Sequence, residues 1–232
     1  MKKIAVFASG SGTNAQNIAE YFLASGDITV SLILANKPDA YVLERAKKLG
    51  IPSIVFSRKE FYESEIILET LQKNKIDFIV LAGFLWLIPD YLLNAYSRKI
   101  INIHPALLPK YGGKGMYGDI VHQAVISSGD KKTGITIHFV NDHYDEGEII
   151  FQDSFDILPG DTAESIASKV HKLEYKHFPR VIEETIRKVD SSPLTVDSSQ
   201  FAVLYSFFIF HFSLFTTLQP YQQLFITYVS KL

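Results

Sequence analysis

The sequence predicts an α/β fold: an open, mostly parallel twisted sheet with helices on both faces and an antiparallel hairpin at one edge. Three observations lead to this expectation. Short runs that are apolar throughout alternate with amphipathic stretches, a pattern typical of parallel strands covered by helices on both sides. Glycine and proline punctuate the junctions between these runs. The length of 232 residues is sufficient to bury such a sheet.

The first half of the chain repeats strand and helix in regular order. We expect strands at 2–9, 28–36, 53–56 and 76–83, and helices at 14–23, 41–49 and 60–73. Gly50 and Pro52 end the second helix. Because right-handed crossovers through helices join parallel strands, this order favours an open sheet over a barrel of hairpins.

The second half adds a short helix after Pro89, a strand at 99–104, a loop rich in proline and glycine at 105–118, and a helix at 117–128. The strands expected at 134–140 and 148–157 flank a turn and predict the edge hairpin. A final helix is expected from about Asp161, where an N-cap precedes an acidic first turn, to about Lys188.

The charge balance excludes several classes of protein. With 23 basic and 25 acidic residues, the net charge of -2 lacks the basic excess of nucleic-acid and membrane-surface binders. The absence of cysteine excludes disulfides, thiol catalysis and cysteine-ligated metals. We therefore expect a cytoplasmic protein with no nucleic-acid or membrane partner.

The last 44 residues differ from the rest of the chain. They contain no glycine, three charged residues and ten aromatic residues, so we divide the chain into a domain at 1–188 and an atypical extension at 189–232. The aromatic run at 201–215 is shorter than the roughly 20 residues that span a membrane. It is interpreted as an interfacial or membrane anchor, a packing or oligomer element, or a non-native extension. The abrupt change in composition favours the last, and deletion of 189–232 should then leave activity intact.

A loop of small residues joins the first strand to the first helix. In Ser9–Asn14, backbone N–H groups can turn inward, and the helix N-terminus adds positive potential, so a phosphate could bind there. The loop is not a P-loop, and it lacks the third glycine of the dinucleotide fingerprint. The alternative is a tight turn in which Thr13 or Asn14 caps the helix.

A second group of polar residues lies at the end of the strand at 99–104. Asn102 and His104 are two residues apart, so their side chains point to the same face. Ligands bind outside the carboxyl ends of strands in open α/β sheets. An amide donor beside an imidazole suits acyl-group chemistry, with the Asn holding an oxyanion and the His moving a proton.

Asp145 lies in the turn that follows the strand at 134–140. It could be a turn former, or it could reach His104 and raise the pKa of the imidazole. The remaining histidines show no metal-binding spacing, so we expect no metal site.

Taken in order, these segments resemble the folate-dependent formyltransferases, and the glycine loop narrows the resemblance to the branch that formylates glycinamide ribonucleotide. The resemblance covers about residues 1–188, and it implies a Rossmann-like formyltransferase catalytic domain there. It rests on IAVFASGSGTN, DFIVLAGF, NIHPALLPKYGG, GITIHFV followed by DEG, and EYKHFP.

The resemblance implies roles for named residues. The implied catalytic residues are Asn102, His104 and Asp145. The implied substrate-binding residues are Gly12, Thr13 and Asn14 for the phosphate, Glu174 for the ribose, and Lys59, Leu85, Trp86, Leu87, Ile88 and Asn102 for the folate. The sequence departs from many relatives at 113–118, where they have a loop of Pro-Gly-x-His type.

The implied reaction is formyl transfer from 10-formyltetrahydrofolate, a co-substrate, to the amine of glycinamide ribonucleotide in purine (IMP) biosynthesis. The amine attacks directly, Asn102 and protonated His104 stabilise the oxyanion, and Asp145 keeps the pKa of His104 high. Small molecules are the expected partners, and the expected state is a monomer or homodimer. The alternatives are a formyltetrahydrofolate hydrolase, another folate-dependent formyltransferase such as the methionyl-tRNA enzyme, or a non-catalytic nucleotide-binding module.

Overall fold

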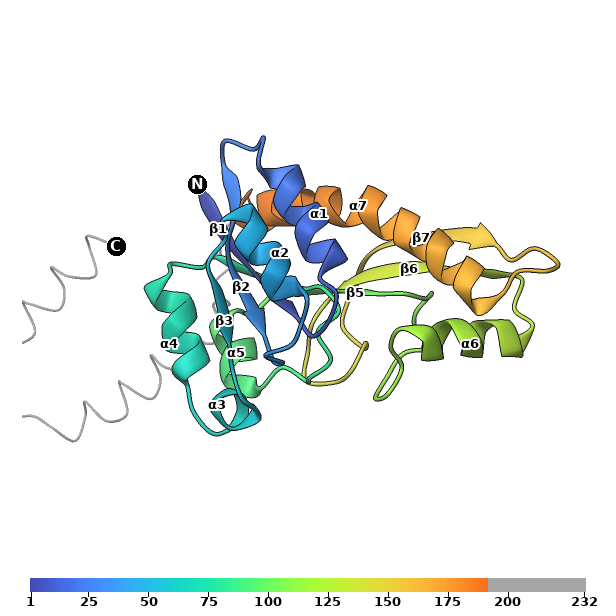
Figure 1. The fold of residues 1–232 in the computed structure, drawn as a ribbon, viewed down its shortest axis with the longest axis horizontal. Helices are drawn as coiled ribbons and strands as arrows, with labels where there is room; N and C mark the ends of the chain where they lie inside the picture. Colours follow the sequence, from blue (N-terminus) through green and yellow to red (C-terminus); the bar gives the residue numbers. More distant parts are fainter. Residues whose placement is uncertain (192–232) are drawn as a thin grey trace, which may run out of the picture. The chain divides into compact units, whose positions relative to one another are not determined.

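The computed structural model describes residues 1–191 and has the predicted α/β architecture, a seven-stranded sheet in the order β3-β2-β1-β4-β5-β6-β7 (Figure 1). The strands are β1 (Lys2–Ala8), β2 (Ile28–Ala35), β3 (Ser53–Val55), β4 (Phe78–Leu81), β5 (Ile100–His104), β6 (Lys132–Phe139) and β7 (Ile149–Asp156). The first five strands are parallel, and β6 pairs in antiparallel fashion with β5 on one side and β7 on the other. The mostly parallel sheet and its edge hairpin are thus confirmed.

Helices cover both faces of the sheet. They are α1 (Thr13–Phe22), α2 (Val42–Leu49), α3 (Arg58–Tyr62), α4 (Ile66–Lys73), α5 (Asp90–Ala95), α6 (Asp119–Ser128) and α7 (Ala163–Ser191). Buried side chains of α1, α2 and α7 join one apolar cluster, and those of α3, α4 and α5 join the other. No helix within residues 1–191 is long and apolar enough to span a membrane.

Strand β1 shows why its sequence is apolar throughout. Ile4 and Val6 belong to the cluster on one face, while Ala5 and Phe7 belong to the cluster on the other. All four are fully buried. Burying a large apolar side chain stabilises the fold by about 1.5–3 kcal/mol, so a central strand needs apolar residues at every position rather than at alternate ones.

The helix expected at 60–73 is two helices. Ser57 and Glu60 form a capping box that starts α3 earlier than predicted. Ser64 then donates a hydrogen bond from its hydroxyl to the carbonyl of Glu60, and such side-chain bonds compete with the helical ladder. The chain therefore leaves the helix at Glu63 and begins α4 at Ile66.

Helix α7 tolerates a proline because another helix supplies the missing donor. Pro179 has no N–H, which leaves the carbonyl of Tyr175 without its helical partner. The side-chain amide of Asn17 on α1 donates to that carbonyl at 3.1 Å. This contact holds α7 beside the start of α1. The extension predicted at 189–232 lies almost wholly outside the described residues and stays a prediction.

The order of the strands reverses at β1, which pairs with β2 on one side and with β4 on the other. Loops that leave neighbouring strands in opposite directions open a crevice at the carboxyl edge of the sheet. A cavity of about 600 Å³ occupies this position. Its walls include the loops that follow β1, β4 and β5.

Candidate active site

The cavity brings together most of the residues singled out in the sequence. Of the predicted site residues, its lining includes Gly12, Thr13, Asn14, Leu85, Trp86, Asn102, His104, Asp145 and Glu174. The glycine loop, the end of β5 and the turn after β6 thus face one space, although they are far apart in the sequence.

The glycine loop keeps the N-terminus of α1 open. Gly12 is the N-cap with φ +72°, and a side chain there would overlap Val42. Among the described residues, no side chain caps this helix, so the alternative in which Thr13 or Asn14 caps it is wrong. The first N–H groups of a helix have no partner within the helix, and they favour an anion.

Two contacts from α2 hold this loop in place. The N–H of Val42 donates to the carbonyl of Gly10 at 3.1 Å, and Nε of Arg45 donates to the carbonyl of Ser11 at 2.8 Å. Arg45 also binds the side chain of Gln16 in the first turns of α1. These two contacts hold the loop through its backbone carbonyls, which are directed towards α2.

Glu174 connects α7 to the glycine loop. One of its carboxylate oxygens, Oε2, accepts from Nδ2 of Asn14 at 2.9 Å and lies 2.9 Å from Nδ1 of His171. Glu174 is buried, and this hydrogen bond raises the pKa of His171. His171 also lines the cavity, so an imidazole with a raised pKa faces the same space as the glycine loop.

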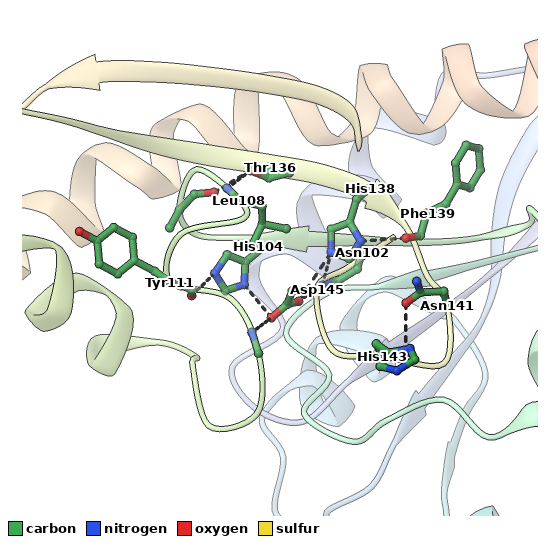
Figure 2. A network of polar contacts seen from close by, with 12 residues as sticks. Asn102, His104, Leu108, Tyr111, Thr136, His138, Phe139, Asn141, His143 and Asp145 are labelled. Carbon is green, nitrogen blue, oxygen red and sulfur yellow. Dashed lines mark hydrogen bonds and ion pairs between the residues drawn. The ribbon is translucent and has the colours of Figure 1, made fainter. Parts of the chain in front are cut away.

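The three predicted catalytic residues meet at the end of β5 (Figure 2). Nδ1 of His104 lies 3.4 Å from Oδ2 of Asp145, and Nδ2 of Asn102 lies 3.4 Å from Oδ1 of the same carboxylate. Asp145 has φ +58°, in the left-handed region that few residues with a side chain adopt. The backbone N–H of Gly113 also donates to Oδ2 at 3.0 Å.

His138 belongs to the same network, and sequence reasoning missed it. It pairs with Asn102 across β5 and β6, and its Nε2 lies 3.1 Å from Nδ2 of Asn102. Its Nδ1 is 2.8 Å from the carbonyl oxygen of Phe139, so Nδ1 carries a proton, and Nε2 accepts when the ring is neutral. The same Nε2 lies 3.6 Å from Oδ1 of Asp145. The strand register places Thr136 and His138 on the same face as Asn102 and His104. The sequence signal that could have identified His138 was its two-residue spacing from Thr136 on the predicted strand at 134–140.

The expected rise in the pKa of His104 is wrong in its net direction. Burial lowers the pKa of the imidazole, and the neighbouring Asp145 carboxylate, which acts in the opposite sense, does not offset it. The ring is 3% exposed, so loss of hydration dominates. Burial raises the pKa of Asp145, but contacts with His138, His104 and the Gly113 N–H lower it more. The pair is therefore a neutral imidazole beside a carboxylate near pH 7.

Only some of the residues predicted to bind folate line the cavity. Leu85 and Trp86 line the cavity, whereas Ile88 is in the core. The N–H of Leu85 already donates to the hydroxyl of Ser9, and the carbonyl of Leu87 accepts from Tyr62. These two backbone groups therefore have partners within the protein.

The basic residue at this end of the cavity is Arg58. Its guanidinium lies 5.6 Å from the ring centre of Trp86 and 4.9 Å from that of Tyr62. Lys59 is exposed and does not line the described cavity. Arg58 is the first residue of α3, and its side chain lies over the rings of Tyr62 and Trp86.

His122 is a further histidine of the cavity wall that sequence reasoning passed over. It is 3% exposed, and its Nδ1 has no hydrogen-bond partner within residues 1–191. Burial lowers the pKa of this imidazole. Within residues 1–191, no group of three His, Asp or Glu side chains is arranged to hold a metal ion.

Comparison with known proteins gives a consistent result. Residues 2–182 match the formyl transferase family. The chain is 42% identical to phosphoribosylglycinamide formyltransferase of Bacillus subtilis, over 80% of this chain and 95% of that protein. It is 43% identical to the chloroplastic enzyme of that name from Vigna unguiculata, over 78% of this chain, but it covers 60% of that longer protein.

Solved structures show the same likeness. The phosphoribosylglycinamide formyltransferase of Bacillus halodurans has a TM-score of 0.73 and 36% identity, covering 81% of this chain and 97% of that one. The Streptococcus pneumoniae protein has a TM-score of 0.71 and 38% identity, covering 80% and 99%. The chain therefore belongs to the formyl transferase family, as its motifs predicted.

Proposed function

We propose that this protein transfers the formyl group of 10-formyltetrahydrofolate to the amine of glycinamide ribonucleotide, a step of purine (IMP) biosynthesis. The observation that carries the proposal is one cavity with an uncapped helix N-terminus at one part of its wall and the Asn102, His104 and Asp145 cluster at another. The names of the relatives support the same reaction.

The cavity walls suit the two substrates. The phosphate of the ribonucleotide would bind the N–H groups of Gly12, Thr13 and Asn14, and its ribose would contact Glu174. The folate would lie beside Leu85 and Trp86. Arg58, which lines the same part of the wall, is a suitable partner for the carboxylates of the folate tail.

The proposed chemistry is a direct transfer. The amine nitrogen forms a bond to the formyl carbon, and the resulting oxyanion accepts a hydrogen bond from Nδ2 of Asn102, whose 3.4 Å contact with Asp145 is weak enough to be exchanged. Neutral His104 takes a proton from the attacking amine and becomes an imidazolium paired with Asp145. The bond from carbon to N10 of the folate then breaks, and His104 returns the proton to N10. No side chain becomes acylated.

Water and aminoacyl-tRNA are the acceptors of the two rival reactions, and an activity assay separates them from the proposal. Folate absorbance would be followed in three reactions: with glycinamide ribonucleotide, with no acceptor, and with charged initiator tRNA. We expect release of the formyl group only with the ribonucleotide. Equal release without an acceptor would identify a hydrolase, reaction only with tRNA would identify the tRNA enzyme, and no reaction in any arm would favour a non-catalytic module.

Compartment and assembly belong to the same proposal. A monomer or homodimer in the cytoplasm that uses small molecules and no nucleic acid is consistent with the net charge of -2. The Vigna and Arabidopsis relatives are named chloroplastic, and the Bacillus relative is bacterial. Size-exclusion chromatography with light scattering, and fractionation of the source cells, would test these expectations.

A further inference from the structure

The backbone of Tyr111 contacts the catalytic histidine. Its carbonyl oxygen lies 2.8 Å from Nε2 of His104 (Figure 2). A carbonyl oxygen only accepts hydrogen bonds, so Nε2 carries a proton, and the single proton of a neutral imidazole is then used. We infer that Tyr111 is a positioning residue that fixes His104 as the Nε2–H tautomer and makes Nδ1 the nitrogen that exchanges protons with the substrates.

The surroundings of Nδ1 suit this role. Its neighbour among the described residues is Oδ2 of Asp145 at 3.4 Å, which is longer than a strong charge-assisted hydrogen bond. While the ring is neutral, the lone pair of Nδ1 faces a lone pair of Oδ2 of Asp145. Once Nδ1 gains a proton, the same pair becomes an ion pair, and Nε2 keeps its bond to Tyr111. The protonated ring therefore has an acceptor for each of its two N–H groups.

Tyr111 is held by its side chain in a conformation that few residues adopt. Its φ is +59°, in the left-handed region that costs a residue with a side chain roughly 1–2 kcal/mol. The phenol hydroxyl donates to Oδ2 of Asp130 at 2.7 Å and lies 2.6 Å from the hydroxyl of Ser128. Lys110 pairs with the same carboxylate at 3.0 Å. These contacts, at the end of α6, fix the direction of the carbonyl.

The same turn also fixes the carboxylate. Gly113 donates its N–H to Oδ2 of Asp145, the oxygen that faces Nδ1 of His104. At Gly112, a side chain would meet the end of the Leu108 side chain and press on Cβ of Asp145, so a glycine suits this close approach. One short turn, Tyr111–Gly113, therefore contacts both members of the pair, with a carbonyl on one and an N–H on the other.

This inference rests on the proposed function only for what Nδ1 does. In formyl transfer, Nδ1 would take the proton from the attacking amine and return it to the leaving nitrogen. Tyr111 is not part of the cavity lining, so changing its side chain should alter the rate of the chemical step rather than the binding of either substrate.

The tautomer is tested by NMR on the full-length protein labelled with nitrogen-15 at its seven histidines. The His104 signals are assigned by their loss in His104→Gln. Above the titration of the ring, we expect a protonated Nε2 and an unprotonated Nδ1, with slow exchange of the Nε2 proton. A protonated Nδ1, or an Nε2 proton that exchanges as fast as that of the exposed His143, overturns the inference.

The positioning role is tested with Tyr111→Phe, which removes the phenol anchor and keeps the backbone. We expect faster exchange of the Nε2 proton and a fall in kcat of between about tenfold and about 100-fold, with both KM values unchanged, because small displacements of a catalytic group cost up to about that much. Asp130→Asn, which keeps the phenol and weakens its acceptor, should give a smaller change in the same direction. It also replaces Tyr111→Phe should that variant not fold.

Tyr21→Phe is the matched control. It removes a phenol-to-carboxylate bond of 2.6 Å, to Glu183, on the surface of α1 and α7. We expect no change in kcat or in the His104 signals. If Tyr111→Phe behaves like this control, the positioning role is wrong. The NMR result does not depend on activity, so a protein with the Nε2–H tautomer and no formyl transfer would refute the proposed function alone.

Discussion

Asn102 and His138 lie opposite each other on β5 and β6, with Nδ2 of the amide 3.1 Å from Nε2 of the imidazole. Nδ1 of His138 faces the carbonyl of Phe139 and carries a proton, so Nε2 accepts when the ring is neutral. This fixes the orientation of the Asn102 amide, with its NH2 group towards His138 and Asp145. The donor proposed for the oxyanion is thus positioned by a neighbouring strand.

The first prediction concerns His138. In His138→Ala the Asn102 amide loses the nearer of its two acceptors and can rotate, so kcat should fall by about tenfold or more, as expected for a misplaced oxyanion donor. KM for the ribonucleotide should change little. Steady-state kinetics would measure both values, with His143→Ala as the control, because that side chain is exposed and pairs only with Asp142 in the described chain. A normal kcat in His138→Ala would contradict the role.

The second prediction concerns pH. Burial lowers the pKa of His104, so the active neutral ring persists as pH falls through the ordinary histidine range, and kcat/KM should decline only below about pH 6.5. Asp145 raises this pKa, so Asp145→Asn should move the decline to still lower pH. The rate should also fall by roughly 10²–10⁴-fold, because the imidazolium loses its partner. A decline that moves to higher pH would contradict the account.

The third prediction concerns the glycine loop. Gly12→Ala should raise KM for the ribonucleotide more than it lowers kcat, because the new side chain would strain the φ +72° turn and push the loop away from Val42. Gly50→Ala is the control: it has φ +68° but open space around it at the end of α2. The control should lose about 1–2 kcal/mol of stability without a change in KM. Equal KM values in both variants would exclude a phosphate site at Gly12.

The fourth prediction concerns the start of α7. Hydrogen bonds from Lys169, the Leu158 N–H and Ser165 lower the pKa of Asp161 to about 2. The ionised group therefore contributes stability above its unfolded pKa of 3.8, and this contribution is lost as pH falls towards 2. Asp161→Asn should have a lower Tm than wild type at neutral pH, and the gap should close on acidification. A gap that is independent of pH would mean that the charge is not responsible.

The sequence predicted the parts of this molecule that depend on local patterns. Alternating strands and helices, and the two-residue spacing of Asn102 and His104, follow from periods that are visible in one chain. The split at Glu63 and the place of Arg58 depended on Ser57 and Ser64, whose hydroxyls compete with the helix. Such competition is decided by geometry that a pattern does not contain.

Other features of the site required three dimensions. The pKa of His104 depends on how far the folded chain excludes water from the ring, and the effect of burial is larger than that of Asp145. The partner of its Nε2 is a backbone carbonyl, which every residue has, so no sequence signal marks Tyr111. The contact between Tyr111 and His104 can therefore be identified only from the folded conformation of the turn.

The turnover of His104→Ala is the most direct test of the account. It would be measured with 10-formyltetrahydrofolate and glycinamide ribonucleotide at saturation, alongside calorimetric binding of the ribonucleotide to show that the site is intact. We expect binding close to that of wild type and a kcat lower by about 10²–10⁴-fold, the range for loss of a catalytic acid or base. Near-normal turnover with normal binding would contradict the claim that His104 moves the proton in formyl transfer.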